Sequence, residues 1–336
     1  MFAHAQAPVR IGIAGGGTDL PAWLQAGNTG RCLSLAIRSY THAVAIKRPD
    51  GRVVASYRKR DEANAATEIA NGLIRESALM HGWEDSFEVH TLSELSSQGS
   101  GLGVSSSIAV ALAACFKRLA NLRHGVTAEP RWQDGGLDVY YSEVAHAAWT
   151  VEIDRLRRPI GRQDHMAAAY GGLRLYRFND THGKVAAQVD RTFTPEEARW
   201  VAQHIVLIQL PEGHDSRAIL AGVKTTDALV HADNAVDVAV AAIAQNDLTA
   251  LGAALKLGHS SKEQIRGAVP SHIAELVTAI EALPGVAGCK IAGAGGGGHL
   301  VIACTPNCIP SLEEHAKLPV FRVEPDLIGV RSDGCV

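Results

Sequence analysis

The stretch "SSQGSGLGVSSSIAVALAACF", residues 96–116, runs from glycines and serines directly into an apolar, alanine-rich helical pattern. Phosphate oxygens need converging backbone N–H groups, and only a chain without Cβ atoms can approach them that closely. A helix N-terminus adds aligned dipoles and unpaired donors. We therefore predict a phosphate-binding segment followed by a helix over about 106–122. The alternative is a glycine-rich connection in which a serine caps the helix.

Two further glycine clusters favour the phosphate interpretation. "AGGGTD" at 14–19 follows a short predicted strand, and "GAGGGGH" at 293–299 lies between two predicted strands. Consecutive glycines cost conformational entropy without a gain in packing. Each cluster alone could be a tight turn, but three together indicate backbone gathered around an anionic ligand. The segment 99–107 lacks the Gly-Lys-Ser/Thr ending of a Walker loop, so that family is not supported.

Several charged side chains stand where phosphoryl transfer would need them, since that chemistry requires a divalent ion and a group that deprotonates the acceptor. Glu152 lies near the end of one predicted helix, with Asp154 as a competing metal ligand, and Asp164 opens the next helix. Arg10, on the first strand, could pair with a catalytic carboxylate and keep it ionised. Asp19 could accept hydrogen bonds from substrate hydroxyls. Surface or capping roles remain the alternatives for these side chains.

Composition and missing motifs argue against other classes of protein. The chain has 336 residues, a formal net charge of -3 and no sustained basic run, which argues against nucleic-acid binding. No signal peptide and no apolar run of roughly 18 residues, the length of a membrane span, is evident. The six cysteines form no CxxC pair, and no HExxH or G-x-S-x-G motif occurs. We expect a cytoplasmic protein without nucleic-acid or membrane partners. The sequence is compatible with a homodimer.

Predicted strands cluster early in the chain and helices late, which favours an α+β fold. No βαβ alternation runs through the sequence, so a doubly wound parallel sheet is disfavoured. The helical pattern is continuous over 61–80 and over 138–157. Separate helices are predicted over 215–231 and 233–245.

Three segments in order resemble the motifs of the GHMP kinases, which include galactokinase, homoserine kinase and mevalonate kinase. They are "APVRIGIAGGGTD" at 7–19, "GSGLGVSSS" at 99–107 and "KIAGAGGGGHLVIA" at 290–303. The resemblance implies two α+β lobes with the active site between them. The N-terminal lobe, residues 1–185, would be ribosomal-protein S5-like and would bind ATP. The C-terminal lobe, residues 186–336, would be ferredoxin-like.

The resemblance also implies the role of individual residues. Asp164 would be the catalytic base, and Arg10 would keep it charged. Ser105 and Glu152 would hold Mg²⁺. The residues matching the ATP-binding segment are Gly99, Ser100, Gly101, Leu102, Gly103, Val104, Ser105 and Ser106. The candidate substrate-binding residues are Gly16, Gly17, Thr18, Asp19, Gly295, Gly296, Gly297 and Arg217.

The segments "GRQDHMAAAYGGL" at 161–173 and "DSRAIL" at 215–220 resemble one branch of the family, the D-glycero-D-manno-heptose 7-phosphate kinases. This implies ATP-dependent transfer to the anomeric hydroxyl of a heptose 7-phosphate. A kinase of an unphosphorylated sugar, such as fucose or galactose, and a non-catalytic ligand-binding relative are the alternatives. A phosphorylated sugar needs a second cationic pocket, for which Arg217 is the first candidate, ahead of Lys262 and Arg266.

Overall fold

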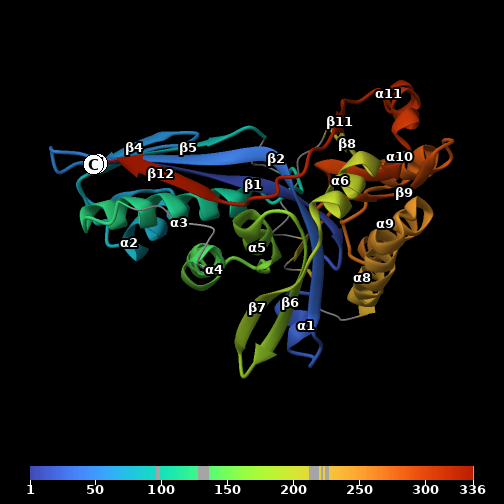
Figure 1. Cartoon of the computed structure of the whole chain (residues 1–336), viewed down its shortest axis with the longest axis horizontal. Coiled ribbons are helices and arrows are strands. Elements are labelled where there is room, and N and C mark those ends of the chain that lie inside the picture. Colours follow the sequence, from blue (N-terminus) through green and yellow to red (C-terminus); the bar gives the residue numbers. More distant parts are fainter. Residues whose placement is uncertain (96–98, 128–135, 212–218, 221, 224–226, 336) are drawn as a thin grey trace.

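Two β-sheets with helices packed against them form the protein in this computed structural model, which describes residues 1–95, 99–127, 136–211, 219–220, 222–223 and 227–335 (Figure 1). The larger sheet has eight strands in the order β12-β1-β2-β5-β3-β4, with β6 beside β2 and β7 beside β6. The smaller sheet has the order β11-β8-β10-β9. The strands are β1 (Phe2–Ala14), β2 (Gly30–Lys47), β3 (Val53–Ser56), β4 (Arg60–Ala63), β5 (Phe87–Ser93), β6 (Leu173–Thr181), β7 (Lys184–Thr192), β8 (Ile205–Gln209), β9 (Val286–Ile291), β10 (His299–Cys304), β11 (Val320–Arg322) and β12 (Arg331–Cys335).

Helix α3 packs along β1 and β2 of the larger sheet, α9 and α10 pack on the smaller sheet, and α8 packs on α9 and contacts β1 and β2 (Figure 1). The helices are α1 (Pro21–Leu24), α2 (Gly72–Met80), α3 (Val104–Arg123), α4 (Gly136–Trp149), α5 (Gln163–Tyr170), α6 (Pro195–His204), α8 (Asp227–Gln245), α9 (Leu248–Glu263), α10 (Ser271–Glu281) and α11 (Ile309–Ala316). A π-helical segment, Thr150–Arg155, continues α4. Within the described residues, no helix is long and apolar enough to cross a membrane.

One edge of β1 is hydrogen-bonded to the glycine segment that precedes α3. Pro8, which has no backbone N–H, marks a register shift between β1 and β2. On the other side of β1, pairing with β12 covers Phe2 to Gln6. Beyond that, the Arg10 N–H donates to the Leu102 carbonyl at 3.0 Å. The segment before α3 is therefore hydrogen-bonded to the strand that carries Arg10.

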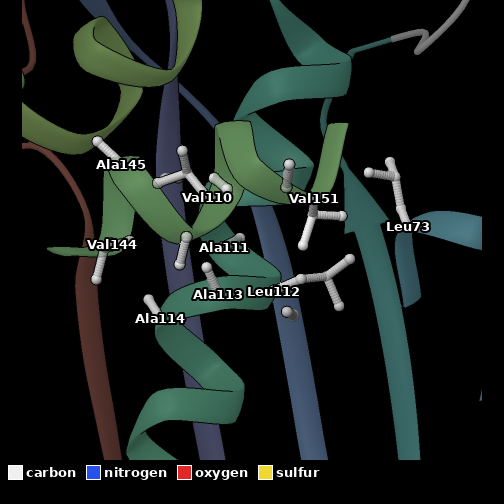
Figure 2. Close-up of a cluster of buried hydrophobic side chains, with 14 of the residues drawn as sticks. Leu73, Val110, Ala111, Leu112, Ala113, Ala114, Val144, Ala145 and Val151 are labelled. Atoms are coloured by element: carbon white, nitrogen blue, oxygen red, sulfur yellow. The ribbon is translucent and has the colours of Figure 1, made fainter. Parts of the chain in front are cut away.

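Helix α3 packs on β1 and β2 and forms the centre of the larger core. Figure 2 shows Val110, Ala111 and Leu112 of α3 in one cluster with Val144 of α4 and Val151. The short alanine side chains of α3 allow close packing on both sides of the helix. This packing fixes the position of the helix start, where the glycine segment ends.

Two glycine segments that lie far apart in the sequence pack against each other. Gly101 has φ +73°, and a Cβ there would come within 2.9 Å of Ala292. Gly298 has φ +88°, and a Cβ there would lie 2.1 Å from the Gly99 carbonyl oxygen. His299 Nδ1 lies 2.8 Å from the Ser100 carbonyl oxygen. The β9–β10 loop is thereby joined to the segment that leads into α3.

The prediction of one helix over 61–80 is wrong in its first part. Residues Arg60–Ala63 form β4, which pairs with β3, and α2 begins only at Gly72. The Asn71 side chain caps α2 by accepting a hydrogen bond from the Ile74 N–H at 3.3 Å. Pairing with β3 prevails over the local helical pattern, as tertiary context commonly does.

The predicted break between helices at residue 232 is also wrong. Helix α8 continues from Asp227 to Gln245, and its buried residues Ala232, Ala235 and Ala239 keep one helical period. Most of the predicted segment before residue 227 lies outside the described residues.

The division into lobes at residue 185 stays a prediction. Strand β7 runs from Lys184 to Thr192 within the larger sheet. Strand β12, near the C-terminal end, pairs with β1 in the same sheet.

Gly298→Ala should destabilise the protein more than Gly267→Ala. Both glycines have left-handed φ, +88° and +80°, but a Cβ at Gly267 would meet nothing within 4 Å. The strained φ costs about 1 kcal/mol at either position, and the close approach to Gly99 adds about 1–3 kcal/mol at Gly298 alone. Urea unfolding followed by circular dichroism measures both free energies. Equal losses would contradict the packing of the two glycine segments.

Candidate active site

The glycine segment leads into a helix as predicted, but no serine caps that helix. Helix α3 begins at Val104, two residues before the predicted start, and Gly103 in left-handed conformation (φ +74°) takes the N-cap position. The first N–H groups of any α-helix have no partner within the helix. The segment therefore offers backbone donors and the positive end of the helix dipole to an anion, and the serine-cap alternative is not supported.

A cavity of about 1150 Å³ opens beside this helix start. Cavities for one small ligand commonly measure about 300–1,000 Å³, and this cavity is slightly larger than that range. Residues from both sheets and their helices line it. The predicted site residues among them are Arg10, Gly16, Gly17, Asp19, Gly99, Ser100, Gly101, Gly103, Val104, Ser105, Ser106, Glu152 and Asp164.

Arg10 and Asp164 form an ion pair at the wall of the cavity. Arg10 Nε and Nη2 lie 2.8 and 2.7 Å from Asp164 Oδ1. Arg10 Nη1 donates to the Gly101 carbonyl at 2.6 Å. The Arg10 side chain is 7% exposed, whereas that of Asp164 is 24% exposed. The pairing predicted from the sequence is present, and it leaves the carboxylate accessible to a ligand.

Glu152 lies at the centre of a second polar cluster. The Ser105 hydroxyl donates to Glu152 Oε1 at 2.9 Å, and His165 Nε2 lies 2.8 Å from Oε2. Arg158 donates to Oε1 and, at 3.1 Å, to the Ser105 hydroxyl. Burial raises the pKa of Glu152, but the His165 hydrogen bond and the charges of His165 and Arg158 outweigh it and lower the pKa to about 2. Glu152 is therefore a buried carboxylate that stays ionised.

Asp19 is held by the turn that precedes α5. The backbone N–H of Gln163 donates to Asp19 Oδ2 at 2.9 Å, and Gln163 Nε2 donates to Oδ1 at 3.0 Å. A Cβ at Gly161 would lie 1.9 Å from Asp19 Oδ2. Burial raises the pKa of Asp19, opposed by the Gln163 backbone hydrogen bond. The glycine therefore allows a close contact that brings Asp19 beside Asp164 at the cavity.

Some predicted substrate-binding residues shape the loops rather than line the cavity. The buried Thr18 hydroxyl donates to the carbonyls of Gly15 and Arg31 at 2.8 and 3.0 Å. Gly295, Gly296 and Gly297 are buried, as is Leu102 of the ATP-binding set, and none of these lines the cavity. The neighbouring Gly293 and Ala294 do line it. Arg217 lies outside the described residues.

Family models match both parts of the chain. The model of the GHMP kinases N terminal domain matches residues 64–172, and the GHMP kinases C terminal model matches residues 239–314. Together they cover more than half of the sequence. The chain belongs to the GHMP kinase family. The predicted family and the predicted α+β fold class are confirmed.

A curated relative and several solved structures resemble this GHMP kinase family member. It is 29% identical over 190 residues to D-glycero-alpha-D-manno-heptose 7-phosphate kinase from Campylobacter jejuni, a match over 52% of this chain and 50% of the relative. The match thus spans about half the length of the curated relative.

Two solved structures are similar over nearly their whole length. A D-glycero-D-manno-heptose 1-phosphate kinase from B. thetaiotaomicron has a TM-score of 0.73 at 16% identity, covering 99% of both chains. Lactococcus lactis galactokinase complexed with galactose has a TM-score of 0.69 at 15% identity, covering 98% of this chain and 95% of that one. At these identities the likeness supports the GHMP kinase fold alone.

The sequence did not reveal two residues of the Glu152 cluster. Arg158 forms the ion pair with Glu152, whereas Arg155, which is nearer in sequence, pairs with Glu76. His165 follows Asp164 directly, and its side chain is fully buried. The position of His165 in the sequence, directly after Asp164 and in the first turn of a predicted helix, could have indicated that it belongs to the site.

Ser105 and Glu152 fit the donor set of Mg²⁺, because that ion takes oxygen ligands and completes its shell with substrate phosphates and water. The two side chains contact each other and reach the cavity that the helix start faces. Asp154, the competing candidate, is exposed and does not line the cavity. No cluster of three or more His, Cys, Asp or Glu side chains suited to a metal occurs in the described part of the chain.

Glu152→Gln should lower the free energy of unfolding by about 3 kcal/mol at pH 7. The folded pKa of about 2 lies below the ordinary value of 4.5, so the stabilisation is present above pH 4.5 and is lost as the pH falls through 2. Urea unfolding at a series of pH values should find the difference from wild type shrinking below pH 4.5. The matched control is Glu275→Gln, at an exposed position of α10. A deficit that stays constant from pH 7 to 3 would contradict the ionised, paired carboxylate.

Proposed function

We propose that this chain is an ATP-dependent sugar kinase whose acceptor is D-glycero-D-manno-heptose 7-phosphate and whose product carries the new phosphate on the anomeric O1. One observation carries the kinase part of the proposal. The Asp164 carboxylate, held by Arg10 and 24% exposed, lines the same cavity as the glycine segment that opens α3. A proton acceptor beside a phosphate-binding loop is the arrangement that transfer to a hydroxyl requires.

Asp164 and ATP together account for the proton and the bonds exchanged in the transfer. The O1–H proton of the sugar passes to Asp164 as O1 forms a bond to the γ-phosphorus of ATP. The bond from that phosphorus to the β–γ bridging oxygen breaks, and ADP leaves. Arg10 pairs with the Asp164 carboxylate and fixes its position at the cavity wall. Most of the rate enhancement comes from holding the two substrates in line.

ATP lies with its phosphates on the segment Gly99–Ser106, where the backbone donors and the α3 dipole compensate their negative charge. When bound at Ser105 and Glu152, Mg²⁺ supplies further neutralisation of the β- and γ-phosphates. Arg158 contacts both of these side chains and adds a positive charge beside them.

The sugar occupies the part of the cavity beside Asp19. Asp19 can accept hydrogen bonds from sugar hydroxyls while Gln163 holds it in place. Gly16 and Gly17 line the cavity at the same loop and leave room for the sugar ring. The heptose acceptor is supported by the partial match to the Campylobacter jejuni enzyme and by the motif resemblance at residues 161–173.

The experiment that tests this function is ATP consumption with Mg²⁺ against a panel of free sugars and sugar 7-phosphates, with phosphorus NMR of the products. A new anomeric phosphate on D-glycero-D-manno-heptose 7-phosphate is expected. Turnover on fucose or galactose alone would replace the acceptor but keep the kinase. ATP binding without transfer to any sugar would overturn the kinase proposal in favour of a non-catalytic ligand-binding protein.

Asp164→Asn should lower kcat by about 10²–10⁴-fold, because the amide cannot accept the hydroxyl proton. ATP should bind with little change, since the glycine segment and Glu152 are intact. Steady-state turnover and calorimetric titration with a non-hydrolysable ATP analogue measure the two effects separately. Asp154→Asn, at an exposed position outside the cavity, is the matched control. Near-normal turnover by Asp164→Asn would remove the base assignment.

A further inference from the structure

Two lysine side chains form part of the cavity wall. Lys262, near the end of α9, is 9% exposed, and Lys290, on β9, is 5% exposed. Lys262 Nζ donates to the Ile291 carbonyl, and Lys290 Nζ donates to the Ile13 carbonyl at 2.8 Å. In the part of the chain that the structure describes, no carboxylate forms an ion pair with either lysine. Among the described residues, the hydrogen-bond partner of each Nζ is thus a backbone carbonyl.

Fold stability does not account for these two lysines. A buried ammonium ion without an anionic partner is costly, and an apolar side chain of similar size is commonly as good or better for stability. Burial and repulsion by Lys290 and Arg10 lower the pKa of Lys262. Burial and the Arg10 charge lower the pKa of Lys290 to about 7. An anion in the cavity would remove this penalty, so the wall is suited to a negatively charged ligand.

The lysines lie toward the loop that we assign to the sugar. Lys262 lines the cavity with Gly258 and Ser261 of α9, and Ile265, just after the helix, lines it too. A Cβ at Gly258 would lie 3.4 Å from Lys290 Cδ, so the missing side chain keeps space beside Lys290. The Ile13 carbonyl that holds Lys290 is at the end of β1, directly before the Gly15–Gly17 loop and Asp19. The glycine segment and α3 supply a separate set of donors for the nucleotide.

We propose that Lys262 and Lys290 bind the phosphate group that the acceptor sugar already carries, so that the protein selects phosphorylated sugars over unphosphorylated ones. This inference rests on the proposed sugar kinase function. Two ammonium groups on α9 and β9 would hold a phosphate dianion by charge-assisted hydrogen bonds. The γ-phosphate of ATP is the other source of the same chemistry, and the experiment separates the two sources.

The test compares wild type, Lys262→Met and Lys290→Met with heptose 7-phosphate and with the same heptose lacking the phosphate. Each lysine that bonds the acceptor phosphate should contribute about 10–100-fold in affinity. We expect kcat/KM to fall at least about tenfold more for the phosphorylated sugar than for the free sugar, with KM for ATP little changed. Lys262→Arg should retain more of the preference for the phosphorylated sugar than Lys262→Met, because arginine keeps the positive charge.

The matched control is Lys256→Met, because Lys256 is on α9 but outside the cavity, where it pairs with Glu281 at 3.3 Å. Lys256→Met should prefer the phosphorylated sugar over the free sugar by the same factor as wild type. Thermal unfolding of each variant tests folding, and Lys262→Gln or Lys290→Gln, which also removes the charge, replaces a methionine variant that does not fold.

Equal losses with both sugars, or a raised KM for ATP, would overturn the inference, because the lysines would then act on ATP or on the fold. These outcomes leave the proposed kinase function intact. If wild type acts on a different sugar phosphate and the variants lose that preference, the inference stands and the heptose assignment fails. If wild type accepts only unphosphorylated sugars, both the inference and the heptose 7-phosphate assignment fail.

Discussion

The contact between Arg10 and Asp164 is the interaction on which the rest of the site depends. It joins β1 to α5 across 154 positions of sequence, and the same guanidinium holds the Gly101 carbonyl. The proposed proton acceptor and the proposed phosphate-binding segment are therefore fixed relative to each other by one side chain. Gly103 permits this closeness, because a Cβ at that position would lie 3.3 Å from Asp164 Oδ2 and the φ of +74° disfavours other residues. Such pre-organised placement is the main contribution that a protein can make to phosphoryl transfer.

The packing of the glycine segments extends this constraint to the second sheet. Gly101 lies against Ala292, and Gly298 lies against Gly99, so the β9–β10 loop follows the position of the segment before α3. Lys290 on β9 and Lys262 on α9 reach the cavity through this arrangement. The cavity is thus assembled from both sheets, although the proposed nucleotide-binding segment and the proposed base come from elements that pack on the larger sheet.

Sequence reasoning could find the residues whose type alone carries the chemistry. Three glycine clusters, an arginine on the first strand and acids at helix ends are visible without coordinates, and the structure brings Arg10, Glu152 and Asp164 to one cavity. It could not find Arg158, because that side chain reaches Glu152 only through the π-helical segment and the turn after it. The family resemblance implied a substrate-binding role for Gly295–Gly297, but a Cβ at Gly295 would lie 2.3 Å from the Ala268 carbonyl oxygen, and the Gly296 N–H donates to that oxygen.

A crystal structure with a non-hydrolysable ATP analogue and Mg²⁺ would test the central claim most directly. We predict that the triphosphate lies along Gly99–Ser106 and that its γ-phosphate faces Asp164 across the space left for the sugar hydroxyl. A second cavity of about 740 Å³ shares Leu95, Gly99 and Ser100 with the first but is otherwise lined by residues such as Arg38, Gln209 and Arg322. Nucleotide bound there, or anywhere away from Asp164, would contradict the account.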